Sequence, residues 1–335
     1  MKCIKVPLAA TAFLGLVAAC ESPYEALELC SARGDSAGRV HVSCFAHQDD
    51  TGRIDEFVSF SQTLEGTSGW IDRWQYGEAL HFTDFNADGL ADLCSARGNA
   101  EGHVEVACHE RDSGGDFSDK ASFTQTVTAL SGWVEDWQYG EALHFADFNG
   151  DERMDLCAVK GTPEGALEVS CLYRDAKGHF PDALSFQQTL TGKPGWVERW
   201  QYGEALHLVD FNADGRTDLC GARGDDAGQL EVFCFLRNGD GSLPDAPSFQ
   251  QFYARGWSNR WRYGEVFHFT DINGDGRLDL CGARGVVSGQ IEVGCFFRSG
   301  ETSLTESATL RQLLSDKDML WTANWSYGEA LHFTR

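Results

Sequence analysis

Four short acidic segments carry the clearest chemistry in this sequence. Each places Asp, Asn, Asp and Asp at positions 1, 3, 5 and 9 of a nine-residue run. Side-chain oxygens at this spacing, with a backbone carbonyl at position 7, can surround a hard cation, and calcium takes six to eight oxygen ligands. Gly at position 6 of three runs lets the backbone turn with positive φ. The predicted calcium ligands are Asp84, Asn86, Asp88, Asp92, Asp147, Asn149, Asp151, Asp155, Asp210, Asn212, Asp214, Asp218, Asp271, Asn273, Asp275 and Asp279.

One exclusion, one departure and one alternative qualify the calcium interpretation. An EF-hand is excluded, because its position 12 needs a bidentate Glu and Ser95 stands there in the first run. Glu152 replaces Gly at position 6 of the second run, which predicts the weakest of the four sites. The alternative is an acidic turn capped by Asp and Asn, a feature that is common as a single copy. Four copies with fixed carboxylate positions favour calcium.

The acidic runs belong to a longer unit that is repeated five times. Its marker is Trp-x3-Trp followed by Tyr-Gly-Glu and a His. The marker contains all 10 tryptophans and recurs at steps of 63, 63, 61 and 64 residues. A period of this size indicates a repeat architecture.

Each repeat predicts four short strands. In the repeat that begins at Trp70, residues 79–83, 93–97, 103–108 and 122–127 are apolar or alternating segments separated by Gly-rich and Asp-rich turns. No segment has a convincing helical period. Equal four-stranded units predict an all-β, five-bladed β-propeller that forms one domain over residues 20–335.

The two ends of the chain complement each other. The last copy stops at Leu331-His332-Phe333-Thr334-Arg335, before its acidic run, and the first copy begins at Leu27-Glu28-Leu29-Cys30, after it. We therefore expect the last strand to pair with the first strand in one blade, which closes the ring and removes exposed sheet edges. Of the acidic run, this closing blade keeps only Glu28, at the position of Asp92.

Ten of the 12 cysteines form five pairs at one spacing. In a hairpin whose turn centres near Glu101, Cys94 and Cys108 lie opposite each other and within reach of a disulfide. Zinc is the rival interpretation, but thiolate zinc sites use tighter spacing and four ligands. Disulfides between neighbouring blades are a second alternative. The predicted disulfides are Cys30–Cys44, Cys94–Cys108, Cys157–Cys171, Cys220–Cys234 and Cys281–Cys295.

Residues 1–19 predict a signal peptide. Lys2 and Lys5 precede an apolar run that is too short to span a bilayer in the mature protein. The run ends in Leu16-Val17-Ala18-Ala19-Cys20, which resembles the lipobox of bacterial lipoproteins, and Cys20 has no partner among the repeated pairs. We expect an exported protein anchored by a lipid on Cys20 to a bacterial membrane, with the outer membrane favoured. The alternative is ordinary cleavage with an incidental Cys20.

The acidic run also indicates a family. Asp-x-Asn-x-Asp-Gly-x-x-Asp-Leu between two short strands resembles the calcium loop of FG-GAP (VCBS-type) repeats, the blades of integrin α propellers. The resemblance covers nearly all of the mature chain, although the literal Phe-Gly and Gly-Ala-Pro words are absent. It implies a propeller fold, calcium-rigidified loops and a role in adhesion or ligand binding. Some members of this family are lectins or parts of enzymes.

Aromatic residues mark a candidate binding surface. Each repeat offers two Trp, one Tyr and one Glu, with a cation in its second strand, and such sets are typical of sugar sites at blade junctions. Alternatively, the tryptophans wedge neighbouring blades together, and the repeated His and Arg are strand-end hydrogen-bonders to the Glu. The candidate ligand-binding residues are Trp70, Trp74, Tyr76, Glu78, Arg97, Trp133, Trp137, Tyr139, Trp196, Trp200, Tyr202, Arg223, Trp257, Trp261, Tyr263, Arg284, Trp321, Trp325 and Tyr327.

Charge and motifs restrict the function further. The formal net charge is −24 and no basic patch could neutralise phosphates, so no nucleic-acid partner is expected. The sequence has no nucleophile elbow, His-Glu-x-x-His motif or phosphate-binding Gly loop, so no catalysis is expected. We expect a lipid-anchored, calcium-stabilised propeller that binds an unknown protein or glycan ligand. The alternatives are a multivalent lectin with repeated inter-blade sites and a structural accessory of a membrane complex.

Overall fold

The computed structural model describes residues 28–34, 39–47, 53–65, 79–99, 101–130, 142–162, 164–192, 205–224, 229–253, 266–285, 290–300, 303–305, 308–315 and 330–334. The predicted signal peptide and Cys20 lie outside these residues. Within the described ranges, no helix is long and apolar enough to cross a membrane.

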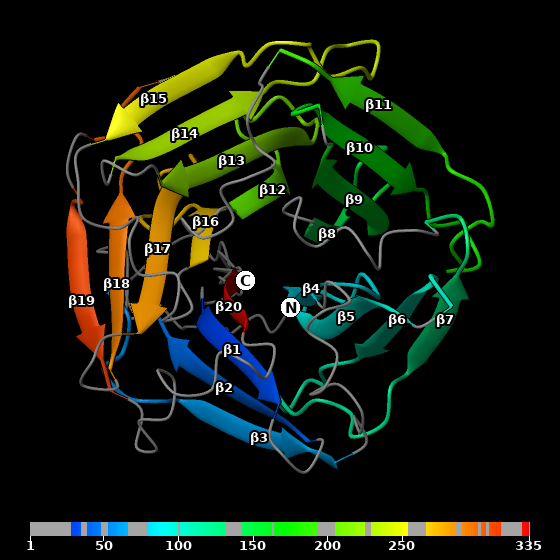
Figure 1. Cartoon of the computed structure of the whole chain (residues 1–335). Helices are drawn as coiled ribbons and strands as arrows, with labels where there is room; N and C mark the ends of the chain where they lie inside the picture. Colours follow the sequence, from blue (N-terminus) through cyan, green and yellow to red (C-terminus); the bar gives the residue numbers. More distant parts are fainter. Residues whose placement is uncertain are drawn as a thin grey trace, which may run out of the picture.

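Among the described residues, twenty strands form five four-stranded antiparallel sheets, and each sheet is one blade of a propeller (Figure 1). Blade 1 contains β20 (Ala330–Thr334), β1 (Glu28–Gly34), β2 (Val40–Ala46) and β3 (Phe60–Leu64). Blade 2 contains β4 (Ala79–Thr83), β5 (Asp92–Gly98), β6 (Val104–His109) and β7 (Phe123–Val127). Blade 3 contains β8 (Ala142–Ala146), β9 (Asp155–Gly161), β10 (Leu167–Leu172) and β11 (Phe186–Leu190). Blade 4 contains β12 (Ala205–Val209), β13 (Asp218–Gly224), β14 (Leu230–Phe235) and β15 (Phe249–Tyr253). Blade 5 contains β16 (Val266–Thr270), β17 (Asp279–Gly285), β18 (Ile291–Phe296) and β19 (Leu310–Leu314).

The predicted fold is confirmed. The strands β20, β4, β8, β12 and β16 lie innermost, and each contacts the innermost strands of both neighbouring blades, so the ring is closed (Figure 1). In blades 2 to 5 the strands run from the axis to the rim in chain order. Blade 1 takes its innermost strand from the other end of the sequence.

The two ends of the described chain close the ring as expected. Strand β20 pairs with β1 in antiparallel register, and Leu29 lies opposite Phe333. Both edges that would otherwise be free at this seam are therefore paired, which protects the propeller from edge-to-edge association.

The predicted disulfides are confirmed within the hairpins. Cys94 pairs directly with Cys108 across β5 and β6, with a Cα–Cα distance of 4.1 Å. The same bond recurs in every blade, as Cys30–Cys44, Cys94–Cys108, Cys157–Cys171, Cys220–Cys234 and Cys281–Cys295. Disulfides persist in oxidising compartments, so five of them indicate an exported protein.

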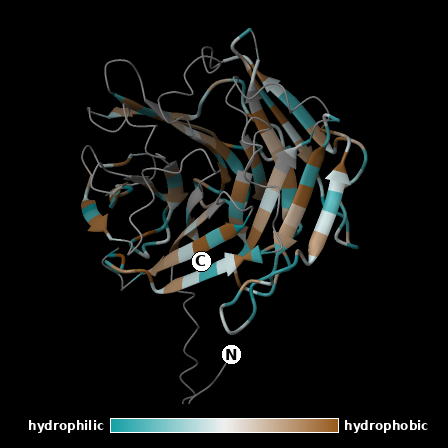
Figure 2. Cartoon of the chain, turned by 60° about the horizontal axis from the view of Figure 1, so that its bottom comes forward, coloured by the Kyte–Doolittle hydropathy of each residue, from teal (hydrophilic) through white to brown (hydrophobic). Residues whose placement is uncertain are grey.

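The core follows the two-residue period of the strands. In β6, Val104 and Val106 are buried, and Glu105 between them is not. Figure 2 shows the same alternation of hydrophobic and hydrophilic residues along the strands. The buried clusters extend from one blade to the next: Val159 of blade 3 packs in one cluster with Phe233 of blade 4. Each fully buried side chain of this kind adds about 1.5–3 kcal/mol, so the blades stabilise one another.

A ring of glutamine amides also joins the blades. The third residue of each outer strand is a Gln whose amide donates to the carbonyl, and accepts from the N–H, of one residue in the next blade. Gln62 forms this pair of bonds with Phe117, both at 2.7 Å. The others are Gln125 with Phe180, Gln188 with Leu243, Gln251 with Leu304, and Gln312 with Ile54. The last pair crosses from blade 5 to blade 1.

Candidate metal-binding loops

The four acidic runs form four equivalent loops on one face of the propeller. Each loop connects the innermost strand of a blade to its second strand. We name them by blade: residues 84–92 in blade 2, 147–155 in blade 3, 210–218 in blade 4 and 271–279 in blade 5. All sixteen predicted calcium ligands lie in these loops. Blade 1 has Glu28 at the start of β1, where blade 2 has Asp92 at the start of β5.

The first Asp of each loop organises the turn. In the blade 2 loop, Asp84 accepts hydrogen bonds from the N–H of Asp88 and of Gly89, each at 3.0 Å. Asn86 Oδ1 accepts a second bond from the same Asp88 N–H at 2.9 Å. The carboxylate oxygen of position 1 and the amide oxygen of position 3 therefore converge on the same backbone N–H. The blade 4 and blade 5 loops repeat this arrangement.

Two residues per loop adopt the left-handed backbone conformation. In the blade 5 loop these are Gly274 and Gly276, at positions 4 and 6, with φ of 73° and 81°. In the blade 3 loop, Glu152 at position 6 has a φ of 65°, although a side chain disfavours that region. The blade 3 loop thus keeps the shape of the others, at a cost of about 1–2 kcal/mol.

The Asp at position 9 fixes the loop to the blade. Asp92 is fully buried and accepts three backbone hydrogen bonds, from Phe85, Asn86 and Arg111 at 3.0, 3.3 and 2.8 Å. Burial raises the pKa of Asp92, Asp155 and Asp218 to about 6 and that of Asp279 to about 7, while the backbone donors act in the opposite direction. For Asp279, repulsion from Asp275 and Asp271 raises the pKa further.

The blade 3 loop contains a buried oxygen that a cation could satisfy. Asn149 Oδ1, at position 3 of the blade 3 loop, is buried and accepts no hydrogen bond from the described residues. An oxygen in this state lacks a positive partner, and a hard cation would supply one. Like-charged carboxylates at positions 1, 5 and 9 would be stabilised by the same ion.

Arginine at position 7 distinguishes the loops. Arg153 and Arg216 form ion pairs with the position 5 carboxylates Asp151 and Asp214 of their own loops. In blade 2, position 7 is Leu90, so no cationic side chain from that position competes for Asp88. Among the loops of blades 2, 3 and 4, the position 5 carboxylate is therefore least neutralised in blade 2.

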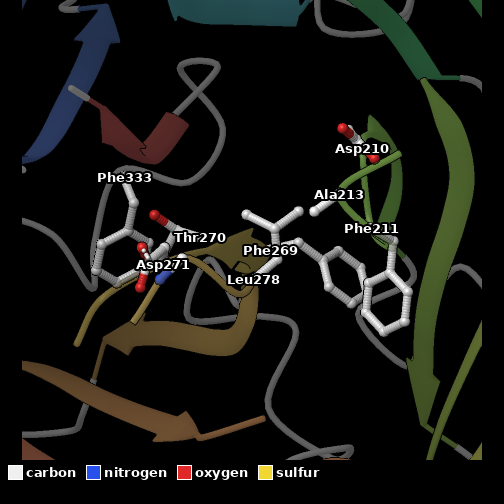
Figure 3. Close-up of a pocket in the computed structure, with 9 residues that line it drawn as sticks. Asp210, Phe211, Ala213, Phe269, Thr270, Asp271, Leu278 and Phe333 are labelled. Atoms are coloured by element: carbon white, nitrogen blue, oxygen red, sulfur yellow. Dashed lines mark hydrogen bonds between the residues drawn. The ribbon is translucent and has the colours of Figure 1, made fainter. Parts of the chain in front are cut away.

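A pocket of about 420 Å³ lies between the blade 4 and blade 5 loops (Figure 3). Asp210 and Asp271 come from the two loops, and Phe269 and Leu278 lie between them (Figure 3). Phe333 of β20 completes the lining. Any molecule held in this pocket would touch both loops.

The repeated His does not have the strand-end role that was one alternative interpretation of the sequence. The five imidazoles form a closed ring around the axis, and neighbouring ring centroids are 4.7–5.8 Å apart. His81 lies in the middle of β4, and its Nε2–H donates to the carbonyl of Leu143 in the next blade. Burial lowers the pKa of His81 and His207 to about 4. The members of the ring are His81, His144, His207, His268 and His332.

The predicted aromatic surface lies outside the described residues, including every Trp and Tyr of the marker and Glu78. The strand positions of Arg97, Arg223 and Arg284 are described. Each is the sixth residue of the second strand in its blade, whereas the acidic loop joins the first residue. The structure therefore places these arginines and the acidic loops at opposite ends of the same strands.

The fold and the loops together define a closed, disulfide-bonded β-propeller with repeated acidic loops on one face. Residues 84–158 and 210–281 match the family model described as an FG-GAP-like repeat, and these two segments contain all four loops. These matches and the five-bladed fold fit an FG-GAP-type propeller.

Similarity to characterised proteins is partial. Phosphatidylinositol-glycan-specific phospholipase D of Mus musculus is 31% identical over 180 residues, which are 49% of this chain and 19% of that protein. The match therefore spans about a fifth of the relative's length. AofleA from Arthrobotrys oligospora has a TM-score of 0.43 at 8% identity, covering 86% of this chain and 69% of its own. A mutant of Aleuria aurantia lectin, in complex with alpha-methyl-L-fucoside, has a TM-score of 0.39 at 8% identity, covering 88% of this chain and 80% of its own. Similarity this low carries no argument about function.

Proposed function

We propose that the protein is a calcium-stabilised propeller that binds a ligand outside the cytoplasm and has no catalytic activity of its own. The unpartnered, buried Oδ1 of Asn149 carries this proposal, and the matching geometry of the four loops supports it. Positions 1, 3, 5 and 9 would hold the ion. The bound ion would neutralise their charges and tie the loop to the start of the second strand.

Calcium should stabilise the protein measurably. Extracellular sites of this kind have dissociation constants on the order of 10⁻⁴–10⁻³ M. At about 10 mM calcium, each occupied site adds about 1.4–2.7 kcal/mol through preferential binding to the native state. Four sites would together raise the melting temperature by many degrees over that of chelated protein.

The test compares thermal unfolding of three proteins in excess EDTA and in calcium. The wild type should melt at a higher temperature in calcium, and Asp84→Ala should lose part of this shift. Asp112→Ala is the matched control, because Asp112 lies outside the loops and its Oδ1 accepts from the backbone N–H of Gly114 and Asp116 in a comparable turn. The control should keep the full shift. If the wild type has the same melting temperature with and without calcium, the loops are acidic turns that bind no ion.

The ligand is proposed to be a protein or a glycan, and not a nucleic acid. The repeated Trp pairs, with cations at the far ends of the second strands, support glycan binding as the second candidate function. A glycan array probed with calcium-loaded protein distinguishes a glycan ligand from a protein ligand. Binding that disappears in Trp70→Ala would favour a lectin, whereas a protein that co-purifies while the array stays blank would favour a structural accessory.

We further propose that the protein is anchored by a lipid on Cys20, in a bacterial membrane and preferably the outer one. The apolar run that ends at Cys20 supports the anchor. Cys20→Ala should abolish labelling by a fatty-acid analogue and release the protein from membranes. A wild-type protein that is soluble and begins after a different cleavage site would contradict the anchor.

A further inference from the structure

One arginine in each of blades 3, 4 and 5 touches two acidic loops at once. The backbone N–H of Arg174 donates to Oδ1 of Asp155, at position 9 of the blade 3 loop, at 2.9 Å. Its guanidinium Nη1 donates to the carbonyl of Phe85, at position 2 of the blade 2 loop, and its Cζ lies 3.6 Å from the Phe85 ring centroid.

The contact repeats around the propeller. Arg237 joins Asp218 of the blade 4 loop to the carbonyl of Phe148 in the blade 3 loop. Arg298 joins Asp279 of the blade 5 loop to the carbonyl of Phe211 in the blade 4 loop, and it is 8% exposed. The guanidiniums stack on the same phenylalanine rings, at 4.0 and 4.3 Å. The four loops therefore form one connected series from blade 2 to blade 5.

The series ends at blade 1. Arg111 of blade 2 makes the same backbone bond, to Asp92, but blade 1 offers no acidic loop. Its Nη1 instead pairs with the carboxylate of Glu28 at 2.8 Å. In blade 1 itself, His47 occupies the position of this arginine. His47 forms an isolated antiparallel β-bridge with Ile54, just as Arg111 does with Phe117. The loops of blades 2 and 5 therefore share no arginine, although both blades adjoin blade 1.

We propose that Arg174, Arg237 and Arg298 are positioning residues that couple ion binding between neighbouring loops. The inference rests on the proposed calcium binding. An ion that rigidifies one loop fixes the carbonyl at position 2, and with it the arginine that holds the position 9 carboxylate of the next loop. The second loop then loses less conformational freedom on binding, which gives positive cooperativity. Coupling of this kind amounts to a change in affinity of about fivefold or more, and it is reciprocal.

The experiment leaves two loops active at a time and measures calcium binding by calorimetry after chelation. Asp84→Ala with Asp147→Ala leaves the blade 4 and blade 5 loops, which Arg298 joins. Asp147→Ala with Asp210→Ala leaves the blade 2 and blade 5 loops, which share no arginine. In the first pair, the affinity for the second ion should exceed that for the first by about fivefold or more. The second pair should bind two ions independently.

A further variant tests the arginine directly. Arg298→Met in the first pair should remove the cooperativity while both ions still bind. If that variant fails to fold, the comparison between the two loop pairs still decides, because it leaves the arginine intact. Independent binding in the first pair, or equal cooperativity in the second, would overturn the coupling. Absence of calcium binding by the wild type is a separate outcome, which refutes the proposed function itself.

Discussion

The histidine ring makes the stability of the propeller depend on pH. Burial lowers the pKa of His207 from 6.5 to about 4. Between these two values the unfolded chain binds more protons than the native protein, so the free energy of unfolding decreases as the pH falls from about 6.5 to about 4. Removing the imidazole by His207→Phe should remove this part of the pH dependence.

The magnitude follows from the two pKa values. Between pH 7 and pH 5, the protonated fraction of His207 rises from about a quarter to nearly one in the unfolded chain, and from almost zero to only about a tenth in the native protein. Linkage converts this difference into about 2 kcal/mol of lost stability, since full uptake of one proton costs about 1.4 kcal/mol per pH unit. His207→Phe should therefore lose about 2 kcal/mol less than the wild type over the same interval.

The assay is urea unfolding of both proteins at pH 7 and pH 5, with disulfides intact and a chelator present throughout. Only the change in the free energy of unfolding between the two pH values is compared, so contributions from other groups cancel. Leu208→Ala is the matched control: it removes a buried, non-titrating neighbour on the same strand. It should lower stability by about 2–5 kcal/mol at both pH values and keep the pH dependence of the wild type.

The reasoning would be refuted by one result in particular. If His207→Phe loses as much stability between pH 7 and pH 5 as the wild type does, then the ring imidazole does not titrate differently in the two states. A pH-independent loss in the variant, however large, would leave the argument intact, because packing changes act equally at both pH values.

Three further predictions concern the framework. Cys220→Ser with Cys234→Ser should lower the free energy of unfolding by about 3 kcal/mol in denaturant titration, because the bond closes a short loop; no change would mean that the pair is reduced in the native protein. Gln188→Met should cost about 1–3 kcal/mol, since it removes both hydrogen bonds to Leu243 of the next blade; retained stability would show that the amide bonds only to solvent. Removing residues 330–334 should expose the edge of β1 that pairs with β20 and produce aggregates on size exclusion, whereas a monodisperse product would contradict closure by β20.

The features that a single repeat encodes could be predicted from the sequence. Alternation along residues such as Val104, Glu105 and Val106 predicts a strand, and the spacing of Cys94 and Cys108 predicts a hairpin bond. The nine-residue acidic run predicts its own loop. These features depend on neighbours within one blade, whose separation along the chain is short. The ring closure could also be predicted, because the terminal copies are complementary.

The contacts between blades became visible only in the folded structure. Gln62 reaches Phe117, 55 residues away in sequence, and Arg298 reaches Phe211, 87 residues away. The repeat marks such a residue in the sequence but does not reveal its partner, because the rotation between blades determines which residues meet. The five imidazoles come together for the same reason: each occupies the middle of an innermost strand, and the closed ring brings those positions to one axis. The sequence marks which residues repeat, and the geometry of closure determines which of them meet.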